Sequence, residues 1–183
     1  MLNRVKALGV TLLVSGIIGC GGSSGGGSVT GIPASTSLMT LTPAQKTQLC
    51  NDVSAYVSRN ISDADGCKLS GLITVLLAAS LDPTLTDADL QSACTQAVTS
   101  CNSTPSTGEC TLGDTSTCSA DATIADLNMC ISDDTALLKG VIAKVPACSG
   151  LTKAWLDANA NLLATAAPAS CTSLDAKCPD LMN

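Results

Sequence analysis

The sequence predicts an all-α fold, a small disulfide-stapled bundle of about six short helices in two groups. Apolar residues recur at helical spacing in six segments. The chain has one Trp, one Tyr and no Phe, so its core lacks the side chains that bury most area. It also has 11 cysteines, and the ten that follow Cys20 form an even number. Five disulfides are therefore expected to support this thin core.

The first predicted group of helices lies within residues 41–101. Thr42-Pro43 opens its first helix, as cap and first-turn proline. Cys67–Ser80 is apolar nearly all round, which predicts a central helix. Thr86 and Asp89 resemble a capping box at the start of the third helix. The predicted helices of this group span residues 43–59, 67–80 and 86–101.

The second predicted group lies within residues 119–178, after a Ser/Thr-rich loop. Ser132 is expected to cap its middle helix, with Asp133 and Asp134 at the positive end of the helix dipole. Trp155 keeps the helical spacing of its apolar neighbours, so we expect it in the core. The predicted helices of this group span residues 121–131, 132–145 and 151–166, and a Cys171–Cys178 tail follows.

The two groups share a short pattern. Ala88-Asp89-Leu90 precedes Cys94, and Ala125-Asp126-Leu127 precedes Cys130. Two related three-helix halves would produce this pattern, and so would a common way of starting a helix.

Helix lengths restrict which cysteines can pair. In an up-down-up trio the first and third helices run parallel, which places Cys50 and Cys94 at one height at about 1.5 Å rise per residue. Cys67 then starts the second helix at the end where the third finishes with Cys101. The expected set is Cys50–Cys94, Cys67–Cys101, Cys118–Cys148, Cys130–Cys171 and Cys110–Cys178. An alternative set contains Cys110–Cys118 and Cys148–Cys178.

The N-terminal region has the organisation of an export signal. Arg4 and Lys6 precede the apolar run Ala7–Ile18, whose 12 residues are fewer than the roughly 20 that a membrane-spanning helix needs. The box Ile17-Ile18-Gly19-Cys20 follows, and residues 21–40 consist mainly of Gly, Ser and Thr. We therefore expect a cleaved signal in residues 1–19, Cys20 and a flexible tether in residues 20–40, and one folded domain in residues 41–183.

These residues resemble the signal peptide of bacterial lipoproteins, with Ile17-Ile18-Gly19-Cys20 as the lipobox. The resemblance implies cleavage between Gly19 and Cys20, a thioether-linked diacylglyceryl group on Cys20 and acylation of the new N-terminus. Because Gly21 rather than Asp follows Cys20, it also implies the outer membrane of a Gram-negative bacterium, on its periplasmic or surface face. An ordinary secretory signal and an uncleaved apolar helix are the alternatives. Export would place the cysteines in an oxidising compartment.

Charge and composition argue against several classes of partner. Without Arg4 and Lys6 the chain has seven basic and 15 acidic residues, a formal charge of −8. An acidic protein is a poor ligand for nucleic acid. The sequence has no His and no C-x-x-C, so the usual zinc, haem c and thioredoxin-like spacings are missing. We therefore predict neither a metal nor a cofactor.

No residue pattern predicts catalysis. Two overlapping G-x-S-x-G matches, at residues 21–25 and 22–26, lie in the Gly/Ser tether without the strand, helix and His that a nucleophile elbow needs. Asp63-Ala64-Asp65-Gly66 lacks the later acidic ligand of a calcium loop. Glu109 lies in a loop. We predict a non-enzymatic envelope lipoprotein that binds or scaffolds a membrane-surface partner. A small-ligand or ion-binding lipoprotein is the alternative, followed by a hydrolase.

Overall fold

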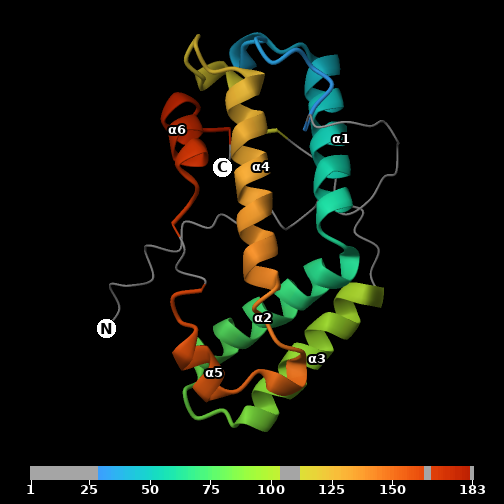
Figure 1. Ribbon diagram of the computed structural model, residues 1–183, viewed down its shortest axis with the longest axis vertical. Coiled ribbons are helices and arrows are strands. Elements are labelled where there is room, and N and C mark those ends of the chain that lie inside the picture. Colours follow the sequence, from blue (N-terminus) through green and yellow to red (C-terminus); the bar gives the residue numbers. More distant parts are fainter. Residues whose placement is uncertain (1–28, 104–111, 163–165, 182–183) are drawn as a thin grey trace. The chain divides into compact units, whose positions relative to one another are not determined.

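The computed structural model describes residues 29–103, 112–162 and 166–181, where the regular secondary structure is helical (Figure 1). The predicted all-α, disulfide-stapled fold is confirmed for these residues, whose only extended pairing is an isolated bridge between Ser37 and Thr123. In these described residues, short 3-10 turns accompany the helices: η2 (Leu38–Thr40), η3 (Thr115–Thr117) and η4 (Cys148–Gly150). The α-helices are α1 (Pro43–Asn60), α2 (Asp63–Leu81), α3 (Asp87–Ser103), α4 (Ile124–Ile142), α5 (Lys153–Ala158) and α6 (Ala169–Lys177).

The chain divides into two compact units that are interleaved in sequence. Within the described residues, unit 1 comprises residues 29–60, 112–137 and 166–181, and unit 2 comprises residues 61–103 and 138–162. The predicted sequential groups, 41–101 and 119–178, are therefore wrong. They assumed that consecutive helices pack together, whereas α1 shares its unit with α6 rather than with α2.

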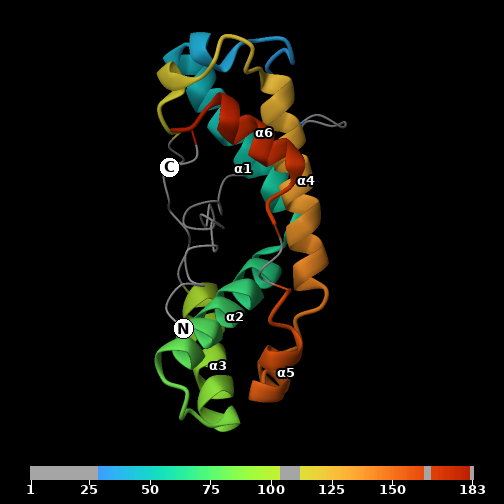
Figure 2. The ribbon, with the colours of Figure 1, turned by 90° about the vertical axis from the view of Figure 1, so that its left-hand side faces the viewer.

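Unit 1 is built from α1, α6 and the first part of α4. Its core joins apolar side chains from distant parts of the chain, because a single helix face cannot bury itself. α6 lies beside the first half of α4 in both views (Figure 1, Figure 2). The fully buried side chains of this core include Leu38, Leu49, Ile124 and Leu174.

Unit 2 is organised around the pair of α2 and α3, which lie side by side (Figure 2). Only five residues, 82–86, join them, so they run antiparallel. Gly71 permits close packing, since a Cβ there would lie 2.8 Å from Val98 Cγ2 and 2.9 Å from Cys94 Sγ. Leu72, Val75, Leu90 and Leu151 are fully buried in this core, and the partly buried Trp155 packs against it, as expected.

The α2 helix starts earlier than predicted, and it is unusually apolar for its length. It begins at Asp63 rather than at Cys67, because Ser62 caps it by accepting a hydrogen bond from the Asp65 N–H at 3.2 Å. Among the described residues it is the helix whose length and composition would allow it to cross a membrane. Its Leu69, Leu72 and Val75 are buried, whereas Leu77 and Leu81 near its end are 59% and 77% exposed.

The predicted break at Ser132 does not occur. α4 continues from Ile124 to Ile142, so Ser132, Asp133 and Asp134 lie in the middle of a helix and cap nothing. Ser-Asp-Asp is typical of a helix start. The apolar residues before and after it, however, lie on the same face of one continuous helix, and burial of that face in the hydrophobic cores favours one long helix.

The end of the chain also differs from the prediction. The helix expected over residues 151–166 is limited to α5 in the described residues, where the Asn159 side chain donates to Trp155 O at 2.8 Å. The tail expected after Pro168 instead forms α6, which buries Cys171 and Leu174.

The prediction of a flexible tether over residues 20–40 is wrong for residues 29–40. Residues 29–40 are folded into unit 1, and Val29, Ile32 and Leu38 are each 5% exposed or less. The prediction of a tether rested on the many Gly, Ser and Thr residues of this segment. Its three apolar side chains nevertheless stabilise the fold when they are buried in the core. Residues 20–28 lie outside the described residues.

The disulfides connect residues within units. Cys67–Cys101 and Cys130–Cys171 are present, as in the expected set. The other two described bonds are Cys94–Cys148 and Cys118–Cys178. Cys50 is disulfide-bonded as well.

Three expected pairs are wrong: Cys50–Cys94, Cys118–Cys148 and Cys110–Cys178. Cys50 and Cys94 belong to different units. Cys118 precedes α4 and Cys148 follows it, and the 19 residues of that helix span about 28 Å. The alternative pairs Cys110–Cys118 and Cys148–Cys178 are wrong too, since Cys118 bonds to Cys178 and Cys148 to Cys94.

Candidate functional site

The residues that sequence analysis singled out for anchoring lie outside the described part of the chain. They are Gly19, Cys20 and the glycine-rich segment with its two G-x-S-x-G matches, and Glu109 and Cys110 also lie outside it. The candidate site that the structure does describe is the end of unit 1 where the chain enters it from Cys20. We call residues 29–45 the neutral cap, because no charged residue occurs between Lys6 and Lys46.

The neutral cap is held at its entry point by burial and by a charged acceptor. Val29 and Thr30 are buried, at 5% and 4% exposure. The Gly31 N–H donates to Asp52 Oδ2 of α1 at 2.8 Å. A hydrogen bond to an ionised carboxylate is stronger than one between neutral groups, so the start of the cap is tied to α1.

The middle of the neutral cap is held by the start of α4. The Leu38 N–H donates to Ala122 O, and the Ile124 N–H donates to Thr36 O, both at 2.9 Å. The Ala125 N–H donates to Ala34 O, also at 2.9 Å. The bonds from Ile124 and Ala125 satisfy N–H groups of the first turn of α4, which have no partner within the helix. The cap is thus part of the helix start.

The last residues of the neutral cap start α1. Thr42 and Gln45 form a capping box in which the Gln45 N–H donates to Thr42 Oγ1 at 3.3 Å and the Thr42 N–H donates to Gln45 Oε1 at 3.0 Å. The predicted start of this helix at Thr42-Pro43 is confirmed.

The outer surface of the neutral cap combines small polar and apolar side chains. Met39 is its large exposed apolar residue, at 43% exposure. The other exposed residues of the cap are Gly31, Pro33, Ala34, Ser35, Thr40, Thr42, Pro43 and Ala44.

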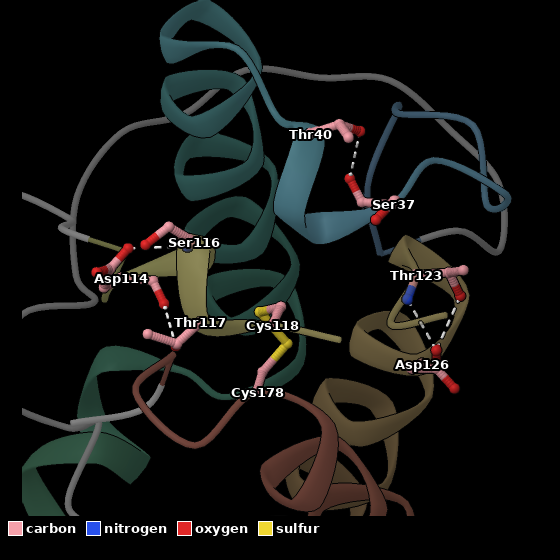
Figure 3. Close-up of a disulfide and its surroundings, with 9 residues drawn as sticks. All are labelled: Ser37, Thr40, Asp114, Ser116, Thr117, Cys118, Thr123, Asp126 and Cys178. Carbon is pink, nitrogen blue, oxygen red and sulfur yellow. Dashed lines mark hydrogen bonds between the residues drawn. A yellow bond between two sulfur atoms is a disulfide. The ribbon is translucent and has the colours of Figure 1, made fainter. Parts of the chain in front are cut away.

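A disulfide lies beside the neutral cap. Cys118 and Cys178 are buried, and their Cα atoms are 4.1 Å apart. Figure 3 shows this bond joining the segment after η3 to the end of α6, with Thr123 and Asp126 of the α4 start nearby. The Ser119 N–H also donates to Lys177 O at 2.7 Å, so two links hold the chain end against the cap region.

Lys177 forms ion pairs with two acids at the start of α4. Its ammonium lies 3.1 Å from Asp126 Oδ1 and 3.6 Å from Asp121 Oδ2. The side chains of Lys177 and Asp126 are each 28% exposed, so solvent only partly screens this pair. The hydrogen bond to Asp126 raises the pKa of Lys177. Burial alone would raise the pKa of Asp126, but hydrogen bonds from Thr123 and Lys177 together lower it.

A second acid at the edge of the cap also has a basic neighbour. Asp114 accepts a hydrogen bond from the Ser116 N–H at 2.8 Å, and that bond lowers the pKa of Asp114 most, with a smaller contribution from the Lys46 ammonium. η3, which follows Asp114, lies against η2 of the cap. Asp114 and Asp121, at the edge of the neutral cap, therefore each have a lysine nearby.

The aspartates weighed above as catalytic or calcium-binding residues lie in the first turns of helices. Asp63 and Asp65 lie in the first turn of α2, where the Ser62 hydroxyl donates to Asp65 Oδ2 at 2.7 Å. Asp89 forms the predicted capping box with Thr86, which is confirmed by bonds of 2.8 and 3.3 Å. Asp87 accepts from the Lys153 N–H at 2.8 Å and so joins α3 to α5.

Asp133 and Asp134 have different surroundings within α4. Asp133 accepts a hydrogen bond from the Ser170 hydroxyl of α6 at 2.6 Å. Asp134 is half-buried, and burial raises its pKa. No group of three or more Cys, Asp or Glu side chains in the described residues is arranged to hold a metal ion.

The similarity between the starts of α3 and α4 comes from shared capping. In both, a Thr N–H and hydroxyl donate to the carboxylate of an Asp three residues later. The distances from that Asp to the following cysteine differ, however, with five residues from Asp89 to Cys94 and four from Asp126 to Cys130. The cysteines are out of register by about 100°, which a duplicated helix would not show.

Sequence reasoning missed the Lys177 cluster and the neutral cap. The Thr-x-x-Asp spacing of Thr123 and Asp126 is the same signal that identified Thr86 and Asp89, and it would have placed the start of α4 correctly. No protein-family model matches this chain, and neither the curated proteins nor the solved structures include a significant match.

Proposed function

We propose that the protein is a bacterial cell-envelope lipoprotein, anchored through Cys20 in the outer membrane of a Gram-negative cell. The observation that carries the proposal is the order of features in residues 1–20: positive charge, a 12-residue apolar run, then Ile17-Ile18-Gly19-Cys20. One acyl chain binds membranes only weakly, whereas two or three anchor a protein stably.

Two properties of the folded part support this proposal. All nine described cysteines are in disulfides, as is typical of an exported protein in an oxidising compartment. The neutral cap begins nine residues after Cys20, so the folded part starts close to the anchor.

The mature part acts as a non-enzymatic binding or scaffold module at the membrane surface. Supporting this, the described acids that sequence analysis weighed for acid–base work cap helices or bridge them, as with Asp89 and Asp87. A protein partner fits a surface of short helices held in place by disulfides, because such a surface loses little conformational entropy on binding.

The anchoring proposal is tested by changing Cys20 to Ser. We expect the variant to move from the membrane to the soluble periplasmic fraction and to lose incorporation of radiolabelled palmitate. Ser23→Ala, three residues later, leaves the lipobox intact and is the matched control. Membrane retention of Cys20→Ser with its apolar run still attached would instead identify an uncleaved N-terminal helix.

The binding proposal is tested by affinity capture of the lipidated protein from envelope membranes. We expect a stable protein partner in the bound fraction. The proposal is abandoned if no protein is recovered while a small metabolite co-purifies, since that outcome identifies the ligand-binding alternative.

A further inference from the structure

The neutral cap supports an inference that rests on the proposed lipid anchor at Cys20. We propose that the neutral cap is the face of unit 1 that contacts the bilayer, and that Met39 enters its interfacial region. The contact sets which face of unit 1 is turned away from the membrane. Three observations support the proposal: the length of chain between anchor and cap, the distribution of charge, and the exposed side chains of the cap.

The length of chain between anchor and cap is short. Residues 21–28 separate Cys20 from Val29. Whatever their conformation, a chain of this length reaches at most about 30 Å, at roughly 3.5 Å per residue. Val29 is buried and the Gly31 N–H is bonded to Asp52, so the chain is fixed to the folded part from the start of the cap. The cap is therefore the described segment that follows the anchor most closely in the chain, and its first residue lies within about 30 Å of Cys20.

The distribution of charge favours the neutral cap over other faces of unit 1. The mature chain has a formal charge of −8, and an anionic membrane surface repels acidic faces. The cap itself contains no charged residue. Among the acids near it, Asp121 and Asp126 share one lysine, Lys177, while Asp114 has Lys46 nearby and Asp52 accepts from the Gly31 N–H. Approach through residues 29–45 thus brings no charge of the cap itself to the bilayer.

The exposed side chains of the cap suit a shallow contact. Met39 is flexible and apolar, and it projects from η2 with 43% of its surface exposed. Pro33, Ala34 and Ala44 of the cap are also exposed and carry no charge that needs hydration. Such a surface would bind a membrane weakly by itself, but the anchor raises its effective concentration at the bilayer.

The proposal is tested with the mature chain, residues 20–183, coupled through the Cys20 thiol to a maleimide lipid in phosphatidylcholine vesicles. Met39→Trp in a Trp155→Phe background places the sole tryptophan on the cap. Ser58→Trp in the same background is the matched control, because this exposed α1 residue lies 15 residues, or about 22 Å, beyond Pro43. Quenching by brominated phosphatidylcholine reports contact with lipid.

We expect brominated lipid to quench the Met39→Trp probe several-fold more than the Ser58→Trp probe. Adding Ser35→Glu to the Met39→Trp chain should reduce quenching on vesicles containing anionic phosphatidylglycerol, whereas Ser58→Glu on α1 of the same unit should not. Equal quenching at both positions, or none at Met39, overturns the proposal. An emission shift of the Met39→Trp probe that depends on protein density but not on brominated lipid also overturns it, because it identifies a second copy as the occupant.

The vesicle experiment is independent of acylation in the cell. Its synthetic lipid replaces the native one, so a failure at Met39 leaves the anchoring of Cys20 untouched. Conversely, a Cys20→Ser variant that stays in the membrane contradicts the proposed anchor whatever the vesicles show.

Discussion

Asp134 interrupts the apolar stripe of α4. Leu127 and Ile131 precede it on that stripe and belong to the core of unit 1, while Leu138 and Val141 follow it and belong to the core of unit 2. The spacing of these positions is four, three, four and three residues, so Asp134 occupies a position that packing would give to a leucine. A carboxylate is costly there, and burial raises its pKa.

Replacing Asp134 with Asn tests this cost. A raised pKa in the folded state means that Asp134 lowers stability once the pH rises through that pKa, whereas below the pKa of the unfolded chain, about 4, it is protonated in both states. We expect Asp134→Asn to raise the free energy of unfolding at pH 7 by less than about 1 kcal/mol, since solvent screens a half-exposed group. The gain should vanish toward pH 3 in urea unfolding.

The neighbouring Asp133→Asn variant is the control. Asp133 is exposed and accepts from Ser170, so its change should bring no gain at pH 7. A pH-independent gain at Asp134 would mean that helix propensity, rather than the buried charge, causes the effect.

At the scale of elements, the contact between α2 and α3 depends on a glycine. Gly71→Ala would place a methyl group 2.8 Å from Val98 Cγ2 and 2.9 Å from Cys94 Sγ. The disulfide to Cys148 restrains Cys94, so Cys94 cannot easily move away from the added methyl group. We expect a loss of about 1–3 kcal/mol of unfolding free energy, measured by chemical denaturation.

Gly140→Ala is the matched control within a helix. No atom lies within 4 Å of a Cβ at Gly140 on α4, so only helix propensity and chain entropy change. We expect a gain of about 0.5–1 kcal/mol. Similar effects at both glycines would contradict close packing at Gly71.

The start of α3 depends on its capping box. Thr86→Ala removes the hydroxyl that accepts from the Asp89 N–H at 3.3 Å and donates to Asp89 Oδ2 at 2.6 Å. We expect a loss of about 1 kcal/mol in thermal or urea unfolding. Thr95→Ala, at an exposed site on the same helix, should change stability little, because its hydroxyl bonds only within the helix to Gln91 O. Equal losses would argue against capping.

At the scale of the whole molecule, each described disulfide joins residues of one unit. Cys67–Cys101 and Cys94–Cys148 lie in unit 2, and Cys118–Cys178 and Cys130–Cys171 lie in unit 1. The two units also have separate hydrophobic cores. We infer that the units differ in local stability and can open separately.

Replacing both Cys94 and Cys148 with Ser tests this independence. The bond spans 54 residues, and its loss should destabilise unit 2 by up to about 4 kcal/mol. Hydrogen exchange should show lost protection in α2 and α3, while the part of α4 before Asp134 and α6 keep theirs. The matching loss in unit 1 is expected from changing Cys130 and Cys171. Simultaneous loss of protection in both units would show one cooperative fold.

Local features of the fold were predictable from the sequence. The start of α1 at Pro43 and the Thr86–Asp89 cap follow from residues within one turn of each other, so short windows contain the whole signal. The continuity of α4 was not predicted, because Ser132-Asp133-Asp134 satisfies the local rule for a helix start. Only the packing of Ile131 and Leu138 on either side decides against it.

The neutral cap, too, was only partly predictable from the sequence. Its lack of charge can be read directly from residues 29–45, but composition suggested a tether there. The burial of Val29, Ile32 and Leu38 depends on α1 and on residues 122–125, about 90 positions later in the chain. The Lys177–Asp126 pair likewise joins residues 51 positions apart, so no pattern within a short stretch of sequence predicts it.

The sequence by itself determined the helical class, the starts of α1 and α3 and the expectation of a disulfide-rich, exported protein, because these depend on composition and on neighbouring residues. Only the tertiary structure decided that the units are interleaved, that Cys94 bonds to Cys148 and Cys118 to Cys178, and that residues 29–40 are folded. The physical reason is that burial of apolar surface is non-directional. Any apolar stripe can pack on any other, and the choice depends on the shapes of segments far apart in the chain.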